Sequence, residues 1–393
     1  MNTFRRIIFW THFAIGLTLG LIIVVLCVSG ALLAFERQLI ELADGDLKTS
    51  KNTDSSNKKF TVSELVSKLN EKEIKPSSLT ITNNAQSRIQ VTAGQGAVFY
   101  LDQSSGEIFE AGKNIRQAMQ TLRELHRYLS LSGESRAVGK AATGAANLVF
   151  IFIIITGLYL WLPRVWSKKH LRPIIWFRKT KTSRARDFNW HNVIGIWAAV
   201  PLLVMAVTAT VISYRWASDL LMWISGENVE AASQNNPRQN ENDKQKAKPD
   251  YTSRIDEVIS VSKAAVTDWQ SMTIRLPLGE TTDVSIDEGI YWNRFGRSTL
   301  TVNTSERKVL KWSPYGERGL GTQLRSWFRF THTGESFGII GQFIAFLGCI
   351  GGAILGYTGI ALAIRRIKGM LPSNKTIGFS ETPDRVKQVQ PEP

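Results

Sequence analysis

The fold of this chain is decided by the stretch Phe188-Asn-Trp-His-Asn-Val-Ile-Gly-Ile-Trp197, which runs into an apolar segment that ends at Tyr214. A basic loop precedes this stretch, so His191 lies at the mouth of a predicted membrane-spanning helix. An imidazole at the edge of a span is costly to place in lipid, and such residues usually face a bundle interior or a ligand. The stretch therefore predicts a helical membrane protein with a site built around histidine.

Three of the other four histidines occupy comparable positions. His12 lies just inside the first apolar run, and His126 and His332 lie just before the second and the last runs. Only His170, in the basic loop, has no such position, and we expect it to be solvated. We therefore expect four spanning helices that present four imidazoles in two pairs.

The first span is predicted over residues 13–35, which contain no charged residue. This run exceeds the roughly 20 residues needed to cross a bilayer. A cleaved signal peptide is the alternative, but its apolar core is typically only about 7–15 residues long. The other spans are predicted near residues 145–162, 191–214 and 337–364.

The formal net charge is +15, which by itself could suggest a nucleic-acid partner. The basic residues instead cluster beside the apolar runs, as they do on the cytoplasmic side of membrane proteins. We therefore expect membrane lipid and no nucleic acid as the surroundings. Both termini and the 164–187 loop should be cytoplasmic, in a multi-pass membrane protein.

The predicted fold class is membrane α-helical, with four transmembrane helices in two parallel repeats, each carrying a small periplasmic α+β domain. In each small domain a helix precedes short strands, expected near 79–82, 88–92 and 97–101, and near 272–275, 283–286 and 298–302. Polar stretches at 45–59, 227–250 and 370–393 carry no fold signal. The expected segments are helix 1 (1–36), periplasmic domain 1 (37–140), helix 2 (141–163), a cytoplasmic loop (164–187), helix 3 (188–215), periplasmic domain 2 (216–336), helix 4 (337–364) and a cytoplasmic tail (365–393).

The repeat can be tested by its register. Asp102 precedes the Gly-Glu-Ser of 133–135 by 31 positions, and Asn303 precedes the Gly-Glu-Ser of 334–336 by 31 positions as well. Because both halves start and end on the same side, they should be related by an axis along the membrane normal. In this register His126 aligns with Trp327 and His332 with Leu131, so the two outer histidines are not equivalent positions.

Topology sorts the histidines by side. His12 and His191 should lie near the cytoplasmic face, and His126 and His332 near the outer face. Two neutral imidazoles that face each other in a helix bundle suit a six-coordinate b haem, so we expect two b haems, one at each face. Zinc is less suited because it favours four ligands in one cluster. The alternative for each histidine is an interfacial residue without a ligand.

Three arginines lie within two turns of the outer histidines and are candidates for pairing with haem propionates: Arg127, Arg325 and Arg329. They could equally be ordinary interfacial charges. Cys27 and Cys349 fall inside apolar runs and are interpreted as small hydrophobic residues, since the chain has no CxxC or CxxCH motif.

Four stretches resemble the PepSY-associated transmembrane family over about residues 4–368: Leu125-His-Arg-Tyr-Leu129, Gly157-Leu-Tyr-Leu-Trp-Leu-Pro-Arg164, Trp190-His191 with Gly195, and Thr331-His-Thr-Gly-Glu-Ser-Phe-Gly338. Members of the family resemble bacterial inner-membrane reductases of ferric siderophores that hold haem on helix-borne histidines. The resemblance implies the same ligand role for His12, His126, His191 and His332. Some relatives carry a fused flavin domain, whereas this chain shows no Gly-rich nucleotide fingerprint.

The sequence thus favours a haem-dependent ferric-siderophore reductase that receives electrons from a separate flavoprotein or quinol. The alternative is a non-enzymatic membrane module whose outer domains bind peptides or a peptidase. No nucleophile and base stand together in the outer domains, so we do not expect hydrolysis. No residue is predicted to be catalytic in its own right.

Overall fold

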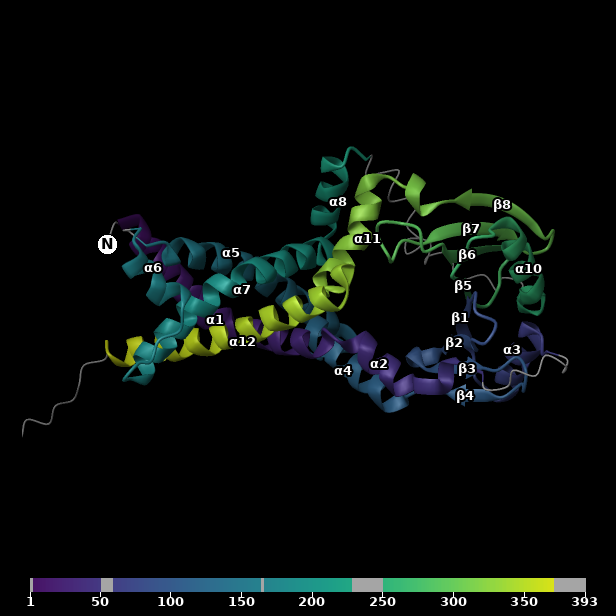
Figure 1. Ribbon diagram of the computed structural model, residues 1–393, viewed down its shortest axis with the longest axis horizontal. Coiled ribbons are helices and arrows are strands. Elements are labelled where there is room, and N and C mark those ends of the chain that lie inside the picture. Colours follow the sequence, from purple (N-terminus) through teal and green to yellow (C-terminus); the bar gives the residue numbers. More distant parts are fainter. Residues whose placement is uncertain (1–2, 51–58, 164–165, 228–249, 371–393) are drawn as a thin grey trace, which may run out of the picture.

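The computed structural model describes residues 3–50, 59–163, 166–227 and 250–370. Figure 1 shows a bundle of long helices at one end of the molecule and a β-sheet at the other. The predictions made for 51–58, 228–249 and the tail from 371 fall outside the described residues. The helices are α1 (Thr3–Leu33), α2 (Glu36–Asp44), α3 (Val62–Glu71), α4 (Lys113–Tyr128), α5 (Arg136–Trp161), α6 (Lys168–Ile175), α7 (Ser183–Ser213), α8 (Arg215–Ile224), α10 (Ile255–Ala265), α11 (Leu320–His332) and α12 (Gly338–Lys368).

Four of these helices, α1, α5, α7 and α12, are long and apolar enough to cross a membrane. Each of α1 and α7 packs against both α5 and α12, so α1 and α7 lie diagonally opposite in the bundle. Glycines on α12 allow this close packing: a Cβ at Gly352 would lie 2.6 Å from the Cys27 sulfur of α1. Cys27 and Cys349 are free and buried in the bundle, as expected for small hydrophobic residues.

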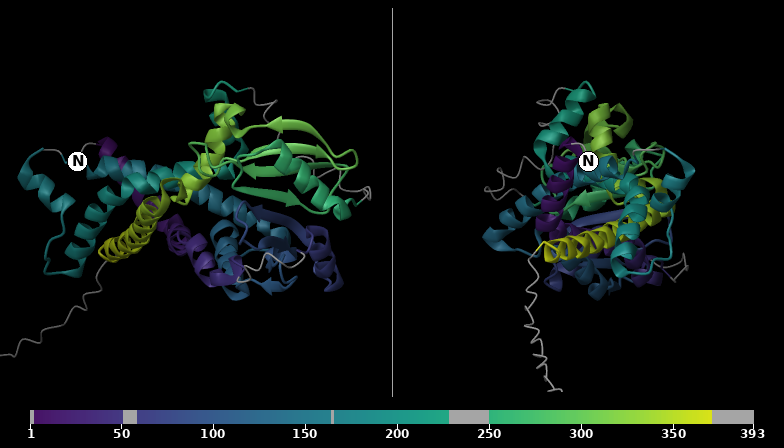
Figure 2. Two further views of the ribbon diagram at one scale, coloured as in Figure 1. Left: turned by 45° about the vertical axis from the view of Figure 1, so that its right-hand side comes forward. Right: turned by 90° about the vertical axis from the view of Figure 1, so that its left-hand side faces the viewer.

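The end of the bundle that carries Arg5, Arg6, Arg365 and Arg366 is called the basic end here, and the opposite end is called the sheet end. The helices α1 and α7 run from the basic end to the sheet end, and α5 and α12 run in the opposite direction (Figures 1 and 2). The strands at the sheet end are β1 (Pro76–Thr82), β2 (Ile89–Ala93), β3 (Val98–Leu101), β4 (Ile108–Glu110), β5 (Ser271–Arg275), β6 (Thr281–Asp287), β7 (Ser298–Asn303) and β8 (Lys308–Ser313).

The two small domains expected from the sequence are joined in the structure. All strands form one eight-stranded antiparallel sheet in the order β4-β3-β2-β1-β5-β6-β7-β8. The halves meet where β1 pairs with β5, with Leu79 opposite Ile274 and a hydrogen bond of 2.9 Å between the hydroxyls of Thr80 and Thr273. An edge strand offers unpaired backbone groups, so two such edges satisfy each other here. The sequence pattern of either half alone does not show this junction.

The helices α3 and α10 cover one face of the sheet, and together they bury a single core that includes Leu65, Leu79, Ile259 and Ile274. Thr61 caps α3 through a capping box with Glu64. The carboxylate of Asp256, from α10, accepts hydrogen bonds from the first two amides of α3 at 2.8 and 2.9 Å. A carboxylate at a helix N-terminus is stabilised by the helix dipole, so the second half caps a helix of the first.

The predicted spans and the six predicted strands match observed elements to within a few residues at their ends, except that α1, α5 and α7 begin earlier than the predicted spans. The amphipathic helices α2, α6 and α8 and the short outer strands β4 and β8 were not predicted. Figure 2 shows that α4 and α11 connect the sheet to the bundle, one from each half. These two helices carry His126 and His332 respectively.

Candidate functional site

The basic end of the bundle contains His12 on α1 and His191 on α7. The Nδ1 atom of His12 lies 2.9 Å from the hydroxyl of Thr156 on α5, and that of His191 lies 3.0 Å from the hydroxyl of Thr358 on α12. The prediction that these histidines lie at corresponding depths agrees with these paired contacts.

A glycine follows each of these threonines and makes room for the ring. A Cβ at Gly157 would lie 3.3 Å from Cε1 of His12, and a Cβ at Gly359 would lie 3.4 Å from Cε1 of His191. Thr358 follows Thr156 by 202 positions, and Gly359 follows Gly157 by the same number. Each half therefore supplies the same Thr-Gly contact for one imidazole. The sequence contains this repeated pair, although the register test did not use it.

The sheet end of the bundle contains the second pair. The Nδ1 atom of His126 lies 2.9 Å from the hydroxyl of Ser29 on α1. The Nδ1 atom of His332 lies 2.9 Å from the carbonyl oxygen of Met205 and 3.4 Å from the hydroxyl of Thr208, both on α7. Ser29 and Thr208 are separated by 179 positions, as are His12 and His191. Ser29 and Thr208 therefore occupy equivalent positions in α1 and α7, even though His126 and His332 do not occupy equivalent positions in α4 and α11.

The hydroxyl partners fix the proton on each ring. Thr156, Ser29, Thr208 and Thr358 each donate their own hydroxyl hydrogen to a carbonyl oxygen one turn back, at 2.6–2.8 Å. Each hydroxyl oxygen is then free to accept, so Nδ1 carries the hydrogen and Nε2 keeps its lone pair. Within the described residues, no Nε2 atom of these four rings makes a hydrogen bond.

The spacing of the outer pair suits two ligands on one metal atom. The ring centroids of His126 and His332 are 6.3 Å apart, with 52° between the ring planes. A metal–nitrogen bond to histidine is about 2.0–2.1 Å and the ring centre lies roughly 1.2 Å behind the nitrogen, so rings on opposite sides of one metal have centroids about 6.4 Å apart. No group of three or more His, Cys, Asp and Glu side chains within the described ranges could enclose a bare ion.

The three arginines named from the sequence lie around the sheet-end pair. All three are exposed. The guanidinium of Arg127 lies 5.3 Å from the ring of Tyr128, and that of Arg329 lies 5.8 Å from the ring of Phe330. Arg127 lies on α4 with His126, and Arg325 and Arg329 lie on α11 with His332; their role toward a cofactor remains a prediction.

Sequence reasoning missed a buried charge at the basic end. Asp187 is fully buried on α7, one turn before His191. Its carboxylate pairs with Arg365 of α12 at 2.5 Å and with Arg186 at 2.9 Å. This ion pair ties α7 to α12 beside the inner histidine. A lone acid in a loop rich in basic residues was the available signal.

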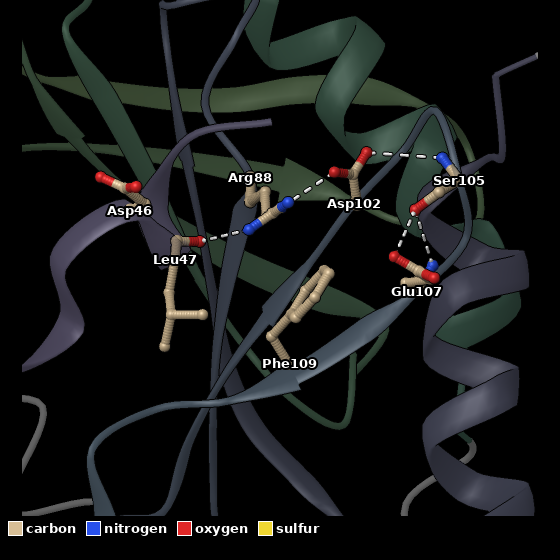
Figure 3. Close-up of a pocket in the computed structure, with 7 residues that line it drawn as sticks. All are labelled: Asp46, Leu47, Arg88, Asp102, Ser105, Glu107 and Phe109. Carbon is tan, nitrogen blue, oxygen red and sulfur yellow. Dashed lines mark hydrogen bonds and ion pairs between the residues drawn. The ribbon is translucent and has the colours of Figure 1, made fainter. Parts of the chain in front are cut away.

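A cavity of about 330 Å³ lies in the first half of the sheet, away from the histidines. Figure 3 shows Arg88 at its floor, donating to the carbonyl oxygen of Leu47 and to Asp102. Asp102 also accepts hydrogen bonds from Ser50 and Ser104. Burial alone would raise the pKa of Asp102, but the hydrogen bonds from Ser104, Arg88 and Ser50 overcome it and lower that pKa well below its usual range. The ion pair stabilises the sheet and does not form part of the histidine site.

The four apolar helices and the sheet that joins their two halves are those of a multi-pass membrane protein with a β-sheet at one end of its helix bundle. The chain belongs to the family described as PepSY-associated TM region, whose model matches residues 9–366. This match covers both histidine pairs and confirms the resemblance stated from the sequence motifs. No curated protein matches the chain.

Proposed function

We propose that this chain is a membrane oxidoreductase that holds two b haems and passes electrons from a cytoplasmic or quinol donor to ferric siderophores in the periplasm. The observation that carries the proposal is that all four histidines show the same hydrogen-bonding arrangement. In each, Nδ1–H donates to an acceptor on the bundle and Nε2 keeps its lone pair. Histidines that bind metal almost always have their other nitrogen held in this way.

The residues fit a b haem better than a bare ion. His126 and His332, with ring centroids 6.3 Å apart, would hold its iron, and two protein ligands would suffice because the porphyrin would supply the others. His12 and His191 would hold the second group from the diagonal helices α1 and α7. When bound, such a haem takes up and gives away single electrons. Arg127, Arg325 and Arg329 would pair with propionates at the sheet end.

The histidines of each half bond only to their own half. His12 and His126 bond to Thr156 and Ser29, whereas the histidines of the second half bond to helices of the second half. Each pair therefore joins the halves only through its shared ligand. This would bring one cofactor near each end of the bundle, a layout suited to moving electrons along it.

The orientation follows from charge. The basic end carries Arg5, Arg365 and the α6 region, and basic loops stay in the cytoplasm. The sheet would then be periplasmic, and the membrane would be the bacterial inner membrane. Reporter fusions at Lys113 and near Glu241 should be active only when the reporter functions outside the cytoplasm. Cytoplasmic activity at either site would contradict the assignment of donor and acceptor sides.

The reaction would transfer one electron to substrate iron. Fe(III) gains the electron and becomes Fe(II), the donor loses one electron, and no bond within the chelator is broken. Siderophores hold Fe(III) through hard oxygen donors, which suit Fe(II) much less well, so reduction releases the metal. A separate flavoprotein or quinol would supply the electron at the basic end.

The test uses detergent-purified protein from haem-replete cells, reduced chemically without oxygen. Addition of a ferric siderophore with a ferrous-specific trap should reoxidise the protein and yield trapped Fe(II) in equal amount. His332→Ala should abolish this reaction, and His170→Ala, which changes a histidine outside the pairs, should not. A colourless protein without a Soret band would favour the peptide-binding alternative. A coloured protein that stays reduced with every chelate would show that ferric chelates are not its electron acceptor.

A further inference from the structure

The connection between β6 and β7 carries a feature that the first half lacks. The corresponding connection between β2 and β3 spans only residues 94–97, whereas this one spans residues 288–297. Asn293 holds the longer loop in place: it is 2% exposed, and its amide donates to the hydroxyls of Tyr315 at 2.7 Å and Ser326 at 2.8 Å. The loop is thus fixed against α11, the helix that carries His332.

The loop places aromatic and cationic side chains over that helix. The ring of Phe295 stacks on Phe330 of α11, with centroids 3.5 Å apart and planes 11° apart. Three guanidinium groups surround the stack: Arg37 and Arg294 lie 5.5 and 5.4 Å from the Phe295 ring, and Arg329 lies 5.8 Å from the Phe330 ring. We call these five residues the arginine–phenylalanine patch.

The patch has more positive than negative charge. Arg37 pairs with Glu41 at 3.3 Å and reaches Glu335 at 3.9 Å. Within the described chain, Arg294 and Arg329 form no ion pair, although both act electrostatically on Glu335. Both side chains are exposed. Two guanidinium groups are therefore available to a ligand from the sheet side.

The same loop and α11 carry further aromatic side chains. Trp327 of α11 lies 6.1 Å from Trp292 and 5.9 Å from Phe337, measured between ring centroids. Trp292 is 57% exposed and Phe337 is 61% exposed. Exposed rings beside unpaired arginines suit a ligand that is both anionic and ring-bearing, because guanidinium groups bind oxyanions and flat rings stack. The patch draws on both halves and lies one turn from His332.

We propose that the arginine–phenylalanine patch is the docking site for anionic, ring-bearing ferric chelates of the tris-catecholate class. The assignment rests on the proposed function, since it names the substrate class of that reaction. Uncharged trihydroxamate chelates lack both the negative charge and the aromatic rings, so they should bind poorly. Arg329 is also a propionate candidate, so the test relies on Arg294, which the proposed haem sites do not use.

The test measures binding without electron transfer. The full-length protein in nanodiscs of uncharged lipid is titrated with the gallium(III) complex of a tris-catecholate chelator, which cannot be reduced under these conditions, and with the uncharged gallium(III) trihydroxamate. The catecholate complex should bind about tenfold or more tightly than the trihydroxamate complex, and added salt should weaken it. Arg294→Glu should weaken catecholate binding by about tenfold or more, and the matched charge reversal Lys311→Glu on the edge strand β8 should not.

Equal binding of the two complexes, or no effect of Arg294→Glu, would overturn the proposal. Loss of haem in Arg294→Glu would also overturn it, because the patch would then serve the cofactor. Displacement of the catecholate by vesicles of anionic lipid, with no preference between the complexes, would assign the patch to phosphate headgroups instead. Specific gallium binding without reduction of the ferric complex would leave the docking site in place and contradict the proposed function.

Discussion

The two halves of the chain hold their histidine side chains with partly different contacts. At the basic end they are alike: His12 on Thr156-Gly157 and His191 on Thr358-Gly359 use equivalent residues. At the sheet end only the acceptors are equivalent, since Ser29 and Thr208 match in register and the histidines that they hold do not. The contacts made by the spanning helices therefore match between the halves, whereas those made by α4 and α11 do not.

The sheet shows the same divergence. The turns at Asp102 and Asn303 are equivalent, because each side chain accepts hydrogen bonds from the two residues that follow it by two and three positions. Asp102 also pairs with buried Arg88 at 2.9 Å, whereas Asn303 is neutral. The first half therefore relies on a buried ion pair where the second does not. The second half instead carries the 288–297 loop.

The largest expected effect comes from removing one ligand of each pair. If each pair holds one haem as proposed, His191→Ala should lose the haem at the basic end and keep the one at the sheet end, and His332→Ala should do the reverse. Redox titration followed by absorbance should show one of two components missing in each variant. Loss of both components in a correctly folded single variant would mean that the two sites are not independent.

The next largest effect concerns the buried ion pair of the first half. Asp102→Asn leaves the buried guanidinium of Arg88 without its charged partner and should lower the free energy of unfolding by about 3–5 kcal/mol. Asn303→Asp, at the equivalent turn, should show no matching gain because no arginine in the described part of the chain pairs with the Asn303 side chain. Thermal melting of the purified protein measures both, and the double variant Asp102→Asn/Arg88→Met should recover part of the loss.

The same pair sets an acid sensitivity. Since the pKa of Asp102 is lower in the folded than in the unfolded chain, its stabilisation is complete above the unfolded pKa of about 3.9 and is lost as pH falls below it. Asp102→Asn should therefore melt with less dependence on pH in that acidic range. Identical pH profiles for the two proteins would show that Asp102 is not the group responsible.

A smaller effect is expected from the acceptors that hold Nδ1. Ser29→Ala should lower haem affinity at the sheet end by about 10–100-fold, because the ring of His126 loses its orienting partner. Thr208→Val should cost less, since the carbonyl of Met205 still accepts from His332 at 2.9 Å. Haem retention during dialysis against apomyoglobin measures the difference, with Thr18→Val on the exposed face of α1 as the control. Equal losses in the two variants would contradict the inequality inferred from these distances.

The smallest effect tests how the halves hold each other in the sheet. Asp256→Asn replaces the carboxylate that caps α3 and should lower the free energy of unfolding by about 1 kcal/mol. Glu257→Gln, which removes only the exposed pair with Arg307, should change it by a few tenths at most. Melting of both variants decides whether the cap from the second half stabilises the first.

The sequence predicted the positions of the spans because a bilayer sets the length of an apolar run. It singled out the four histidines near the ends of those spans because imidazoles are rare there. It did not predict that β1 and β5 join the halves, since pairing of two edges depends on where the halves stand relative to each other. The hydroxyl partners were also missed: a threonine or serine within a span usually bonds to its own helix, and only the repeated Thr-Gly at 156 and 358 distinguishes two of them. The 288–297 loop has no counterpart in the first half, so the repeat gave no information about it.

The ratio of haem to protein in the purified wild-type chain decides whether both histidine pairs hold haem. The protein is isolated from haem-replete cells, its haem is measured as the pyridine haemochrome, and its concentration is measured by amino-acid analysis. Two b haems per chain are predicted, one for each pair of histidines with a free Nε2. A ratio of one or less, unchanged when haem is added during purification, would contradict the account.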